Sequence, residues 1–239
     1  MESTELKTES LSIFFPAYND AATIGNLVTS FLEEGRHYAE NIEVIVVNDG
    51  SSDDTAAVLN DLALQLPELR VIHHPENRGY GAALITGFMH CRSEMIFYTD
   101  GDAQYRASDL HSLFAALTPE TDVVNGYKIA RSDNFVRVLV GNLYKCLTRL
   151  CFGIRMRDVD CDYRLIRRKA MEPFQLKSAT GVICTEMVYQ WQKHRCRIAE
   201  VPVHHYPREH GSSQFFSLRH LRNAVFGLIG LWFRLHFRK

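Results

Sequence analysis

The sequence predicts an α/β fold: a doubly wound, mostly parallel sheet followed by a C-terminal amphipathic helix. Short apolar, β-branched runs alternate with helical patterns through the first hundred residues, as in a parallel sheet covered by helices on both faces. Polar clusters follow these runs, at the sheet edge where doubly wound folds bind ligands. The 239 residues are 46% hydrophobic and 23% charged, which is typical of a soluble domain and excludes disorder, collagen and coiled coil.

Four strands are expected in the first half. Pro16 closes the first of them, and the polar segments 18–20, 48–49 and 99–102 follow the first, second and fourth. The carboxyl ends of parallel strands meet at one edge of a sheet, so these polar groups are expected to lie together. The expected strands are Leu11–Phe15, Val44–Val47, Val71–Ile72 and Met95–Tyr98.

Helices are expected between these strands. Asn19 and Asp20 are the expected caps of the first helix, and Asp53-Asp54 opens the second. Gly79 and Gly81 are expected to let the third helix start close to the sheet. The apolar face of the first helix is Ile24, Leu27, Val28, Phe31 and Leu32, at helical spacing.

The regular alternation breaks down after residues 122–126, and a basic stretch follows. No linker rich in Gly, Ser or Pro divides the chain. One domain over residues 11–213 is therefore expected, after a polar tail at 1–10 and before an amphipathic helix at 214–239.

The C-terminal segment has one apolar and one basic face. Its apolar stripe repeats every three or four residues, and its apolar run of ten residues is too short to cross a bilayer. Such a helix fits the surface of an anionic membrane, although a helix docked on the sheet is the alternative. The apolar stripe is Leu218, Leu221, Val225, Leu228, Trp232 and Leu235; Arg219, Asn223, Arg234 and Arg238 lie roughly opposite. A second stripe, for which a core position is at least as well favoured, is Val136, Leu139, Leu143, Leu147 and Leu150.

The formal net charge of −1 hides an uneven distribution. Residues 208–239 contain six Lys or Arg and one Glu, so the preceding chain is acidic. This indicates an anionic partner, and the amphipathic pattern favours lipid over nucleic acid. No signal peptide is recognised, so we expect a cytoplasmic protein at the membrane surface. Its six scattered cysteines are expected to be reduced and mostly buried.

Asp100-Gly101-Asp102 directly follows an apolar strand. Two carboxylates this close repel each other unless a cation neutralises them, and Mg²⁺ or Mn²⁺ takes one or two carboxylates together with substrate phosphates. The alternative is an ordinary Asp-Gly turn.

Several other chemistries are disfavoured. Gly79-Tyr80-Gly81 lacks the third glycine and the later acid of a dinucleotide-binding site. The chain has no Gly-Lys-Ser/Thr phosphate loop and no Gly-x-Ser-x-Gly elbow. His73-His74 and His204-His205 are expected at strand ends or on the surface.

Taken together, six motifs in order resemble the family 2 glycosyltransferases of the GT-A (Rossmann-like) fold, most closely the dolichyl- or polyprenyl-phosphate sugar synthases. The resemblance runs from about Leu11 to Ser213. The motifs are Phe15–Asp20, Val47–Thr55, Asn77–Ala83, Asp100–Gln104, Asp158–Leu165 and Arg208–Ser213.

The resemblance implies a role for each matching residue. For nucleotide-sugar binding it implies Pro16, Ala17, Tyr18, Asp20, Asp49, Arg78, Gly81, Ala82, Asp100, Gly101 and Lys128. For the metal, Mg²⁺ or Mn²⁺, it implies Asp100, Asp102 and Gln104; for the acceptor phosphate, Arg137, Arg208 and Ser213; for catalysis, Asp102, Asp162 and Arg208.

Two departures bear on the donor. Lys128 stands where mannose synthases have arginine, and Gln214 where they have lysine, and both changes weaken phosphate contacts. Asn48-Asp49-Gly50 is more like the UDP-sugar members. We therefore expect an inverting transfer of glucose from UDP-glucose to polyprenyl phosphate. GDP-mannose as donor, a hydroxyl as acceptor, and a catalytically silent nucleotide-sugar-binding scaffold at the membrane are the alternatives.

Asp162 has two interpretations. It matches a position proposed as catalytic base in glucosyl members, and an alcohol acceptor would need a base. A lipid phosphate, with a second pKa of about 6, is already ionised near neutral pH. In that case Asp162 would orient Arg164 or the acceptor.

Overall fold

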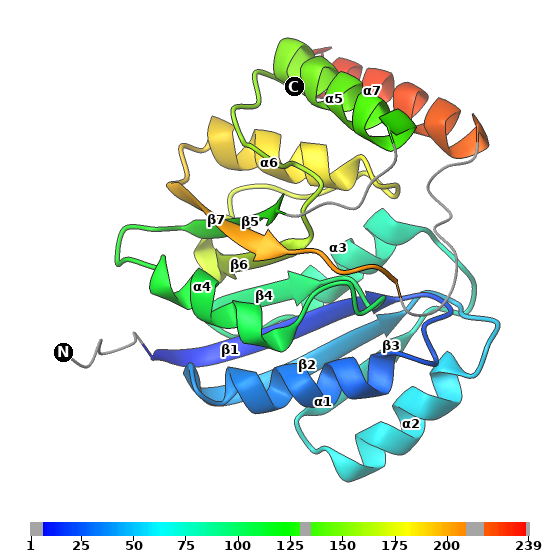
Figure 1. Cartoon of the computed structure of the whole chain (residues 1–239), viewed down its shortest axis with the longest axis vertical. Helices are drawn as coiled ribbons and strands as arrows, with labels where there is room; N and C mark the ends of the chain where they lie inside the picture. Colours follow the sequence, from blue (N-terminus) through cyan, green and yellow to red (C-terminus); the bar gives the residue numbers. More distant parts are fainter. Residues whose placement is uncertain (1–6, 130–134, 209–217, 238–239) are drawn as a thin grey trace.

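A computed structural model of the chain contains one seven-stranded sheet with helices on both faces (Figure 1). It describes residues 7–129, 135–208 and 218–237, with backbone alone for 135–140, 142–143 and 218–224. In chain order the elements are β1 (Thr8–Ala17), α1 (Ile24–Gly35), β2 (Ala39–Asn48), α2 (Thr55–Gln65), β3 (Leu69–His73), α3 (Tyr80–His90), β4 (Met95–Thr99), η1 (Ala107–Asp109), α4 (Leu110–Ala115), β5 (Val123–Ile129), α5 (Phe135–Phe152), β6 (Tyr163–Arg167), η2 (Arg168–Ala170), α6 (Ile183–Lys193), β7 (Ile198–His204) and α7 (Leu218–Phe237).

The predicted doubly wound sheet is confirmed. Its strand order is β3-β2-β1-β4-β6-β5-β7, and the four strands of the first half are parallel. β1 is longer than expected, because Pro16 pairs with Val47 inside it rather than closing it. β6 is antiparallel to both β4 and β5, and β5 is parallel to β7. The reversed strand β6 places its first residue, Tyr163, beside Thr99 at the end of β4.

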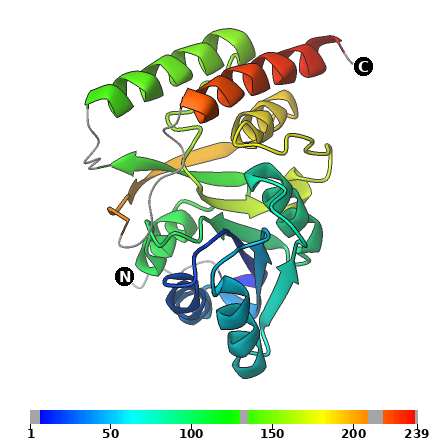
Figure 2. The ribbon, with the colours of Figure 1, turned by 90° about the vertical axis from the view of Figure 1, so that its right-hand side faces the viewer.

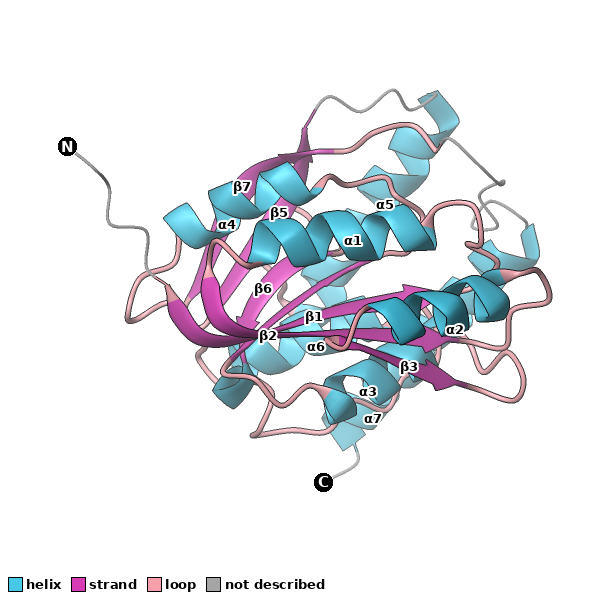
Figure 3. Cartoon of the chain, turned by 90° about the horizontal axis from the view of Figure 1, so that it is seen from below, coloured by secondary structure: helices cyan, strands magenta, loops and turns pink. Residues whose placement is uncertain are grey.

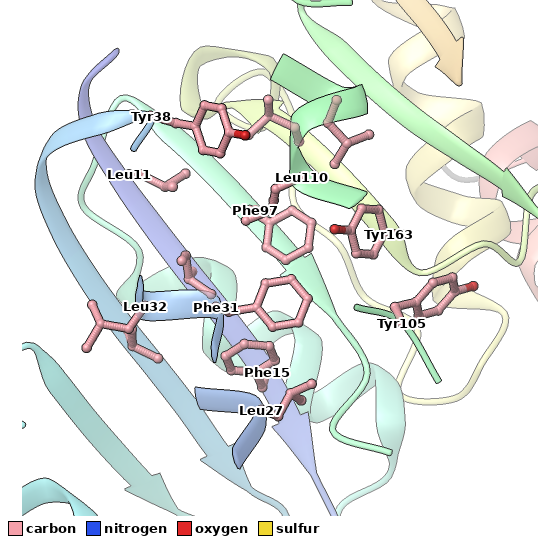
Figure 4. Close-up of a cluster of buried hydrophobic side chains, with 14 of the residues drawn as sticks. Leu11, Phe15, Leu27, Phe31, Leu32, Tyr38, Phe97, Tyr105, Leu110 and Tyr163 are labelled. Carbon is pink, nitrogen blue, oxygen red and sulfur yellow. The ribbon is translucent and has the colours of Figure 1, made fainter. Parts of the chain in front are cut away.

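Two apolar cores lie on opposite faces of the sheet. Leu11, Ile13 and Phe15 of β1 pack against α1, α2 and α4, whereas Phe14 packs into the core formed by α3, α6 and α7. This alternation is the period of two expected for a strand buried on both sides. Figure 3 shows the helices distributed over the two faces. In the first core, the aromatic rings of Phe31 and Phe97 stack at 5.3 Å (Figure 4).

The predicted caps of the first helix were wrong. α1 begins at Ile24 with Thr23 at the N-cap position, and neither Asn19 nor Asp20 caps it through its side chain in the part of the chain described. The Asp20 carboxylate instead accepts a hydrogen bond from the Tyr18 amide at 2.9 Å. Asp53 and Asp54 precede α2 as expected: Asp54 is at the N-cap position, and Oδ1 of Asp53 accepts from the Thr55 amide at 3.0 Å.

The C-terminal helix forms, and Leu228, Trp232 and Leu235 of its predicted apolar stripe share one face, whereas Val225 of that stripe is exposed. α7 lies beside α5 and over α6 (Figures 1 and 2). Leu228 and Leu231 are buried in the second core, with Trp232 and Leu235 packed against it. The alternative of a helix docked on the protein is therefore correct for this face. Arg234, which was expected opposite the apolar stripe, forms an ion pair with Glu186. A different stripe, the exposed ridge, faces outward: Val225, Phe226, Ile229, Phe233 and Phe237.

The second predicted stripe is exposed where its side chains are described. Leu147 is 36% and Leu150 is 78% exposed on α5, so the core interpretation fails for these two residues. Val136, Leu139 and Leu143 lie outside the described side chains. Among the described residues, no helix has the length and hydropathy needed to cross a membrane.

The cysteines are free, as predicted, but only half are buried. Cys91, Cys161 and Cys184 are buried, Cys196 is half-buried, and Cys146 and Cys151 are exposed on α5. His73 and His204 end β3 and β7, in agreement with the prediction.

Candidate active site

Four loops meet at one edge of the sheet. Three follow the carboxyl ends of β1, β2 and β4, and the fourth precedes the antiparallel strand β6. Because Thr99 pairs with Tyr163, the acidic segments 100–102 and 160–162 leave the sheet side by side. The result is a group of five carboxylates, which we call the acidic cluster: Asp20, Asp100, Asp102, Asp160 and Asp162.

The loop after β1 is tied tightly to the loop after β4. A side-chain carbon at Gly101 would lie 2.9 Å from both the Pro16 carbonyl oxygen and Oδ2 of Asp20, so only glycine permits this approach. Burial raises the pKa of Asp20 to about 6, and the nearby charge of Asp102 also raises it. Tyr18 is 39% exposed beside this loop, where its ring is available to a ligand.

Asp49 lies beneath the site rather than on its surface. Its side chain is 4% exposed and its Oδ1 lies 2.6 Å from Nδ1 of His74. The amides of Arg78 and Gly79 donate to its two carboxylate oxygens at 3.0 and 2.9 Å. These bonds fix the loop before α3, so Asp49 can act on a nucleotide through the exposed Arg78 that it positions.

The first turn of α3 packs on the sheet as expected, through Ala83 and Leu84, but its two glycines meet a loop. The Gly81 amide donates to the Ala179 carbonyl at 2.9 Å. A side-chain carbon at Gly81 would lie 2.1 Å from the Ser178 carbonyl oxygen. Between the two glycines, the Tyr80 hydroxyl donates to Oδ1 of Asp100 at 2.8 Å. Ala82 follows, half-buried, with its amide bonded to the Gly79 carbonyl.

Asp100 and Asp102 lie close to each other and to Asp162, so the negative charges of these carboxylates repel one another. Burial raises the pKa of Asp100 well above its usual range, and the charges of Asp162 and Asp102 raise it further. Burial also raises the pKa of Asp102, although Arg208 opposes that shift. A cation placed between these groups would remove the repulsion and favour both ionised forms.

Arg208 and Gln104 are joined at Asp102. Nη2 of Arg208 lies 2.6 Å from Oδ2 of Asp102, and its Nε donates to Oε1 of Gln104 at 3.0 Å. The other end of the Gln104 amide donates to the Tyr206 carbonyl at 2.9 Å. Gln104 was predicted to assist a metal. In the structure its side chain contacts both Tyr206 and Arg208, and so it joins the chain after β7 to the acidic cluster.

Asp160 and Asp162 line the opposite side. Burial raises the pKa of Asp160 to about 7, against the lowering effect of Lys128. The Tyr98 hydroxyl and the Cys184 thiol lie 3.2 and 3.3 Å from Oδ1 of Asp162. The Asp162 carboxylate is therefore held through Oδ1, and neither contact involves its other oxygen.

Lys128 is part of the same wall. Its Nζ donates to the Asp160 carbonyl, and its amide donates to Oδ2 of Asp158 at 3.3 Å. Burial lowers the pKa of Lys128, but the charge of Asp158 and of neighbouring groups raises it by more, so the net shift is upward. Lys128 is thus held charged beside the cluster.

Arg164 supports the 159–162 loop from inside the protein. It is fully buried; Nε donates to the Cys161 carbonyl at 3.0 Å, and Nη2 to the Val159 carbonyl. Among the described residues no direct bond joins it to Asp162, so the orienting partner that the sequence suggested for Asp162 acts on the backbone instead.

Two predicted phosphate contacts cannot be placed. The side chain of Arg137 and all of Ser213 lie outside the described residues. Arg208, the third, is described and meets Asp102.

The residues present fit a divalent metal held jointly with a substrate. Within the described ranges no group of three His, Cys, Asp or Glu could hold a metal ion alone. Asp100 and Asp102 supply carboxylate oxygens, and Mg²⁺ is commonly bound by one or two carboxylates together with substrate phosphates. Burial raises the pKa of both acids, and a bound cation would favour their ionised forms.

Sequence reasoning missed three side chains that shape this site. Tyr80 and Tyr98 each bond an acid of the cluster, and His74 holds Asp49. Tyr80 lies within a motif that was recognised, but nothing in its spacing indicates a contact with an acid twenty residues later. The same holds for Tyr98, which reads as one residue of an apolar strand.

Comparison with known proteins agrees with this geometry. Over 229 residues the chain is 27% identical to an undecaprenyl-phosphate 4-deoxy-4-formamido-L-arabinose transferase of Sodalis glossinidius (strain morsitans), covering 95% of the chain and 69% of the relative. It is 28% identical over 223 residues to the protein of that name from Pseudomonas savastanoi pv. phaseolicola (strain 1448A / Race 6), covering 92% and 64%. The chain thus spans about two thirds of the length of these relatives.

A solved structure shares the fold. Glucosyl-3-phosphoglycerate synthase from Mycobacterium tuberculosis, crystallised with Mn²⁺, UDP and phosphoglyceric acid, superimposes with a TM-score of 0.74 at 17% identity, covering 94% of this chain and 78% of the other. The model of the family described as glycosyl transferase family 2 matches residues 12–174. That match contains the acids that follow β4 and precede β6, and most of the sheet. The protein is a glycosyltransferase with a GT-A fold, and its chain belongs to glycosyl transferase family 2.

Proposed function

We propose that this enzyme transfers a sugar from a nucleotide-sugar to a polyprenyl phosphate at the membrane surface, with inversion and with Mg²⁺ or Mn²⁺. The observation that carries the proposal is the meeting of Asp100, Asp102 and Arg208 at the edge of the sheet. Carboxylates there can hold a cation, and an arginine beside them can bind phosphate.

The chemistry follows from charge. When a sugar leaves a nucleoside diphosphate, negative charge develops on the leaving phosphate, and a bound divalent metal stabilises it as a Lewis acid. Asp100 and Asp102 would hold that metal. Arg208 is 35% exposed and already paired to Asp102, so it can turn toward a phosphate without leaving the site. Lys128 adds a second fixed positive charge.

The acceptor assignment is supported by the relatives. Those compared are named as undecaprenyl-phosphate transferases, and a lipid phosphate is already ionised near neutral pH. Such an acceptor needs positioning more than deprotonation. Asp162 remains our candidate for the catalytic carboxylate, since it lies directly before β6 at the site, and one of its oxygens is free of the bonds from Tyr98 and Cys184.

A membrane location is supported by the exposed ridge on α7. Four of its residues, Val225, Ile229, Phe233 and Phe237, repeat at intervals of four and lie along one line of the helix. Leu150, on the neighbouring α5, is 78% exposed. Apolar side chains of this size insert into the headgroup boundary of a bilayer. We place the protein at the cytoplasmic face, held peripherally.

UDP-glucose is the donor that we propose first. The solved structure with the same fold was crystallised with UDP and Mn²⁺. In this chain, Asp49 of the Asn48-Asp49-Gly50 segment accepts a hydrogen bond from the Arg78 amide and so positions Arg78. The relatives' names specify a different sugar, 4-deoxy-4-formamido-L-arabinose, which makes the UDP derivative of that sugar the second candidate.

The test is a parallel assay with purified protein, Mn²⁺ and vesicles containing polyprenyl phosphate. The donors are UDP-glucose, UDP-galactose, UDP-N-acetylglucosamine, UDP-4-deoxy-4-formamido-L-arabinose and GDP-mannose. We expect a lipid-linked sugar from one UDP donor, and its loss with Asp102→Asn but not with Asp61→Asn, a change on the exposed side of α2. Donor binding without turnover would support a scaffold, and transfer only to hydroxyl compounds would overturn the lipid-phosphate acceptor.

A further inference from the structure

A buried carboxylate outside the acidic cluster organises the loop before α6. The side chain of Glu186 is 2% exposed. Its carboxylate accepts hydrogen bonds from the amides of Lys177 at 3.2 Å and Ser178 at 2.8 Å. Arg234 of α7 lies 3.1 Å away and also donates to the Ser178 hydroxyl at 2.7 Å. One acid thus joins the backbone of the 177–179 loop to the C-terminal helix.

That loop is in direct contact with the start of α3. The Ala179 carbonyl accepts the Gly81 amide, and side-chain carbons at Gly79 and Gly81 would lie 2.7 and 2.1 Å from the carbonyl oxygens of Ala179 and Ser178. The two backbone segments therefore touch directly, with no side chain of Gly79 or Gly81 between them. Tyr80 stands between the two glycines and donates to Asp100. A shift of the 177–179 loop must consequently move Tyr80.

The seam between α7 and this loop is partly open at the surface. It contains a pocket of about 560 Å³, lined by Thr180 and Val182 on one side and by Gly230 and the ridge residue Phe233 on the other. Arg234 crosses this seam to reach Glu186. If α7 were displaced, Glu186 would remain as a buried charge without its cation, a costly arrangement that the loop would have to relieve by rearranging.

We propose that Glu186 is a positioning residue for the reaction, which couples the seating of α7 through the 177–179 loop and Tyr80 to the carboxylate of Asp100. The proposal rests on the proposed function, because it assigns Asp100 to the donor and metal site. It also gives α7 a second task. The helix that carries the exposed ridge sets the geometry of the site, so contact with a surface and readiness for catalysis are linked.

A purely structural role for Glu186 is the competing explanation, and a double-mutant cycle separates the two. The variants are Glu186→Gln, Tyr80→Phe and their combination, with Glu172→Gln as control because Glu172 forms an exposed pair with Arg168. The measured quantity is the dissociation constant for UDP in the presence of Mn²⁺, by calorimetry. We expect each single change to weaken binding about tenfold, and the combination to weaken it by far less than the product, since both act on one path.

Arg234 supplies a milder variant that preserves folding. Arg234→Lys keeps the charge opposite Glu186 and should retain most of the binding, whereas Arg234→Met should behave like Glu186→Gln. The proposal would be overturned if the double variant weakened UDP binding by the product of the two single effects, because the two residues would then act independently. A Glu186→Gln protein whose unfolding midpoint falls while its dissociation constant is unchanged would also overturn it.

Hydrogen exchange of the ligand-free protein tests the coupling without any substrate. In Glu186→Gln we expect faster exchange in both 177–181 and 79–83, and no change in Glu172→Gln. Faster exchange confined to 177–181 would overturn the coupling. A wild-type protein that binds neither UDP nor Mn²⁺ would reject the proposed function, while the exchange at 79–83 would still decide whether the two loops are linked.

Discussion

Arg208 and Asp102 form an ion pair at 2.6 Å, and the same guanidinium donates to Gln104. Arg208 follows the last strand of the sheet, whereas Asp102 follows β4. The pair therefore closes the site by joining two distant parts of the chain. It also keeps a positive charge on the acidic cluster when no substrate is bound.

Replacing Arg208 should impair transfer strongly. Hydrogen bonds to charged groups contribute about 1.5–3 kcal/mol, so Arg208→Ala should lower kcat/KM for the nucleotide-sugar by about 10- to 100-fold. Arg208→Lys should recover only part, because an ammonium cannot donate to Asp102 and Gln104 with the planar fork of arginine. Steady-state kinetics against Arg36→Ala, which removes an exposed ion pair with Glu68, provides the comparison. Equal activity of the lysine variant and the wild type would show that charge alone suffices.

Asp162→Asn should abolish transfer. The amide keeps the shape of the side chain and can still accept from the Tyr98 hydroxyl, but it lacks the negative charge that faces the site. Turnover with polyprenyl phosphate is the measurement, and Asp61→Asn is the matched change on the surface. A variant that retains most of its activity would remove Asp162 from the catalytic residues and leave it a role in loop structure.

Stability should fall as the pH rises from about 4 to about 7. Burial raises the pKa of Asp160 from 3.8 to about 7, so in this interval the folded state binds more protons than the unfolded state. The contribution is fully present below the unfolded pKa and is lost as the pH passes the folded one. Urea midpoints at pH 5 and pH 8 should therefore differ less in Asp160→Asn than in the wild type. An unchanged difference would show that other groups carry the pH dependence.

Membrane binding should depend on the exposed ridge. Full burial of a large apolar side chain contributes about 1.5–3 kcal/mol, so Phe226→Ser with Ile229→Ser should weaken partition into anionic vesicles by at least about tenfold. Leu64→Ser is the control, since Leu64 is 88% exposed on α2. Removing the whole of α7 is a poorer test, because Leu228 and Leu231 belong to the core. Unchanged co-sedimentation of the double variant would count against this surface.

The sequence was most informative where strands are buried on both faces. The runs that became β1, β2 and β4 are short, largely apolar and followed by polar turn residues, and these features favour a buried strand over a buried helix. β6 was not predicted, because its second residue is the charged Arg164; carbonyls of the preceding loop accept hydrogen bonds from that buried guanidinium. The six-residue α4 is too short to show a helical period.

The acids of the candidate site could be predicted from the sequence, but the residues that contact them could not. Asp100 and Asp102 follow a strand, and a strand end fixes where they project. Their contacts with Tyr80 and Arg208 join segments far apart in the chain, and no local pattern encodes such pairings. The helical period likewise predicted α7 but not its orientation: Val225 and Leu228 lie on adjoining stripes, and only packing on α6 decides which of them is buried.

The register of the reversed strand β6 fixes the positions of both Arg164 and the acidic segment that precedes the strand. Successive residues of a strand face opposite sides, so slipping β6 by one position would carry Arg164 into the wrong core and withdraw Asp162 from Asp100. Among the described side chains of α5, Phe152 is buried in the second core and Tyr144 packs against it, so side-chain packing and not a strand register holds this helix. A shift of α5 would therefore exchange one set of side-chain contacts for another, whereas a shift of β6 would change the distance between the two acidic segments.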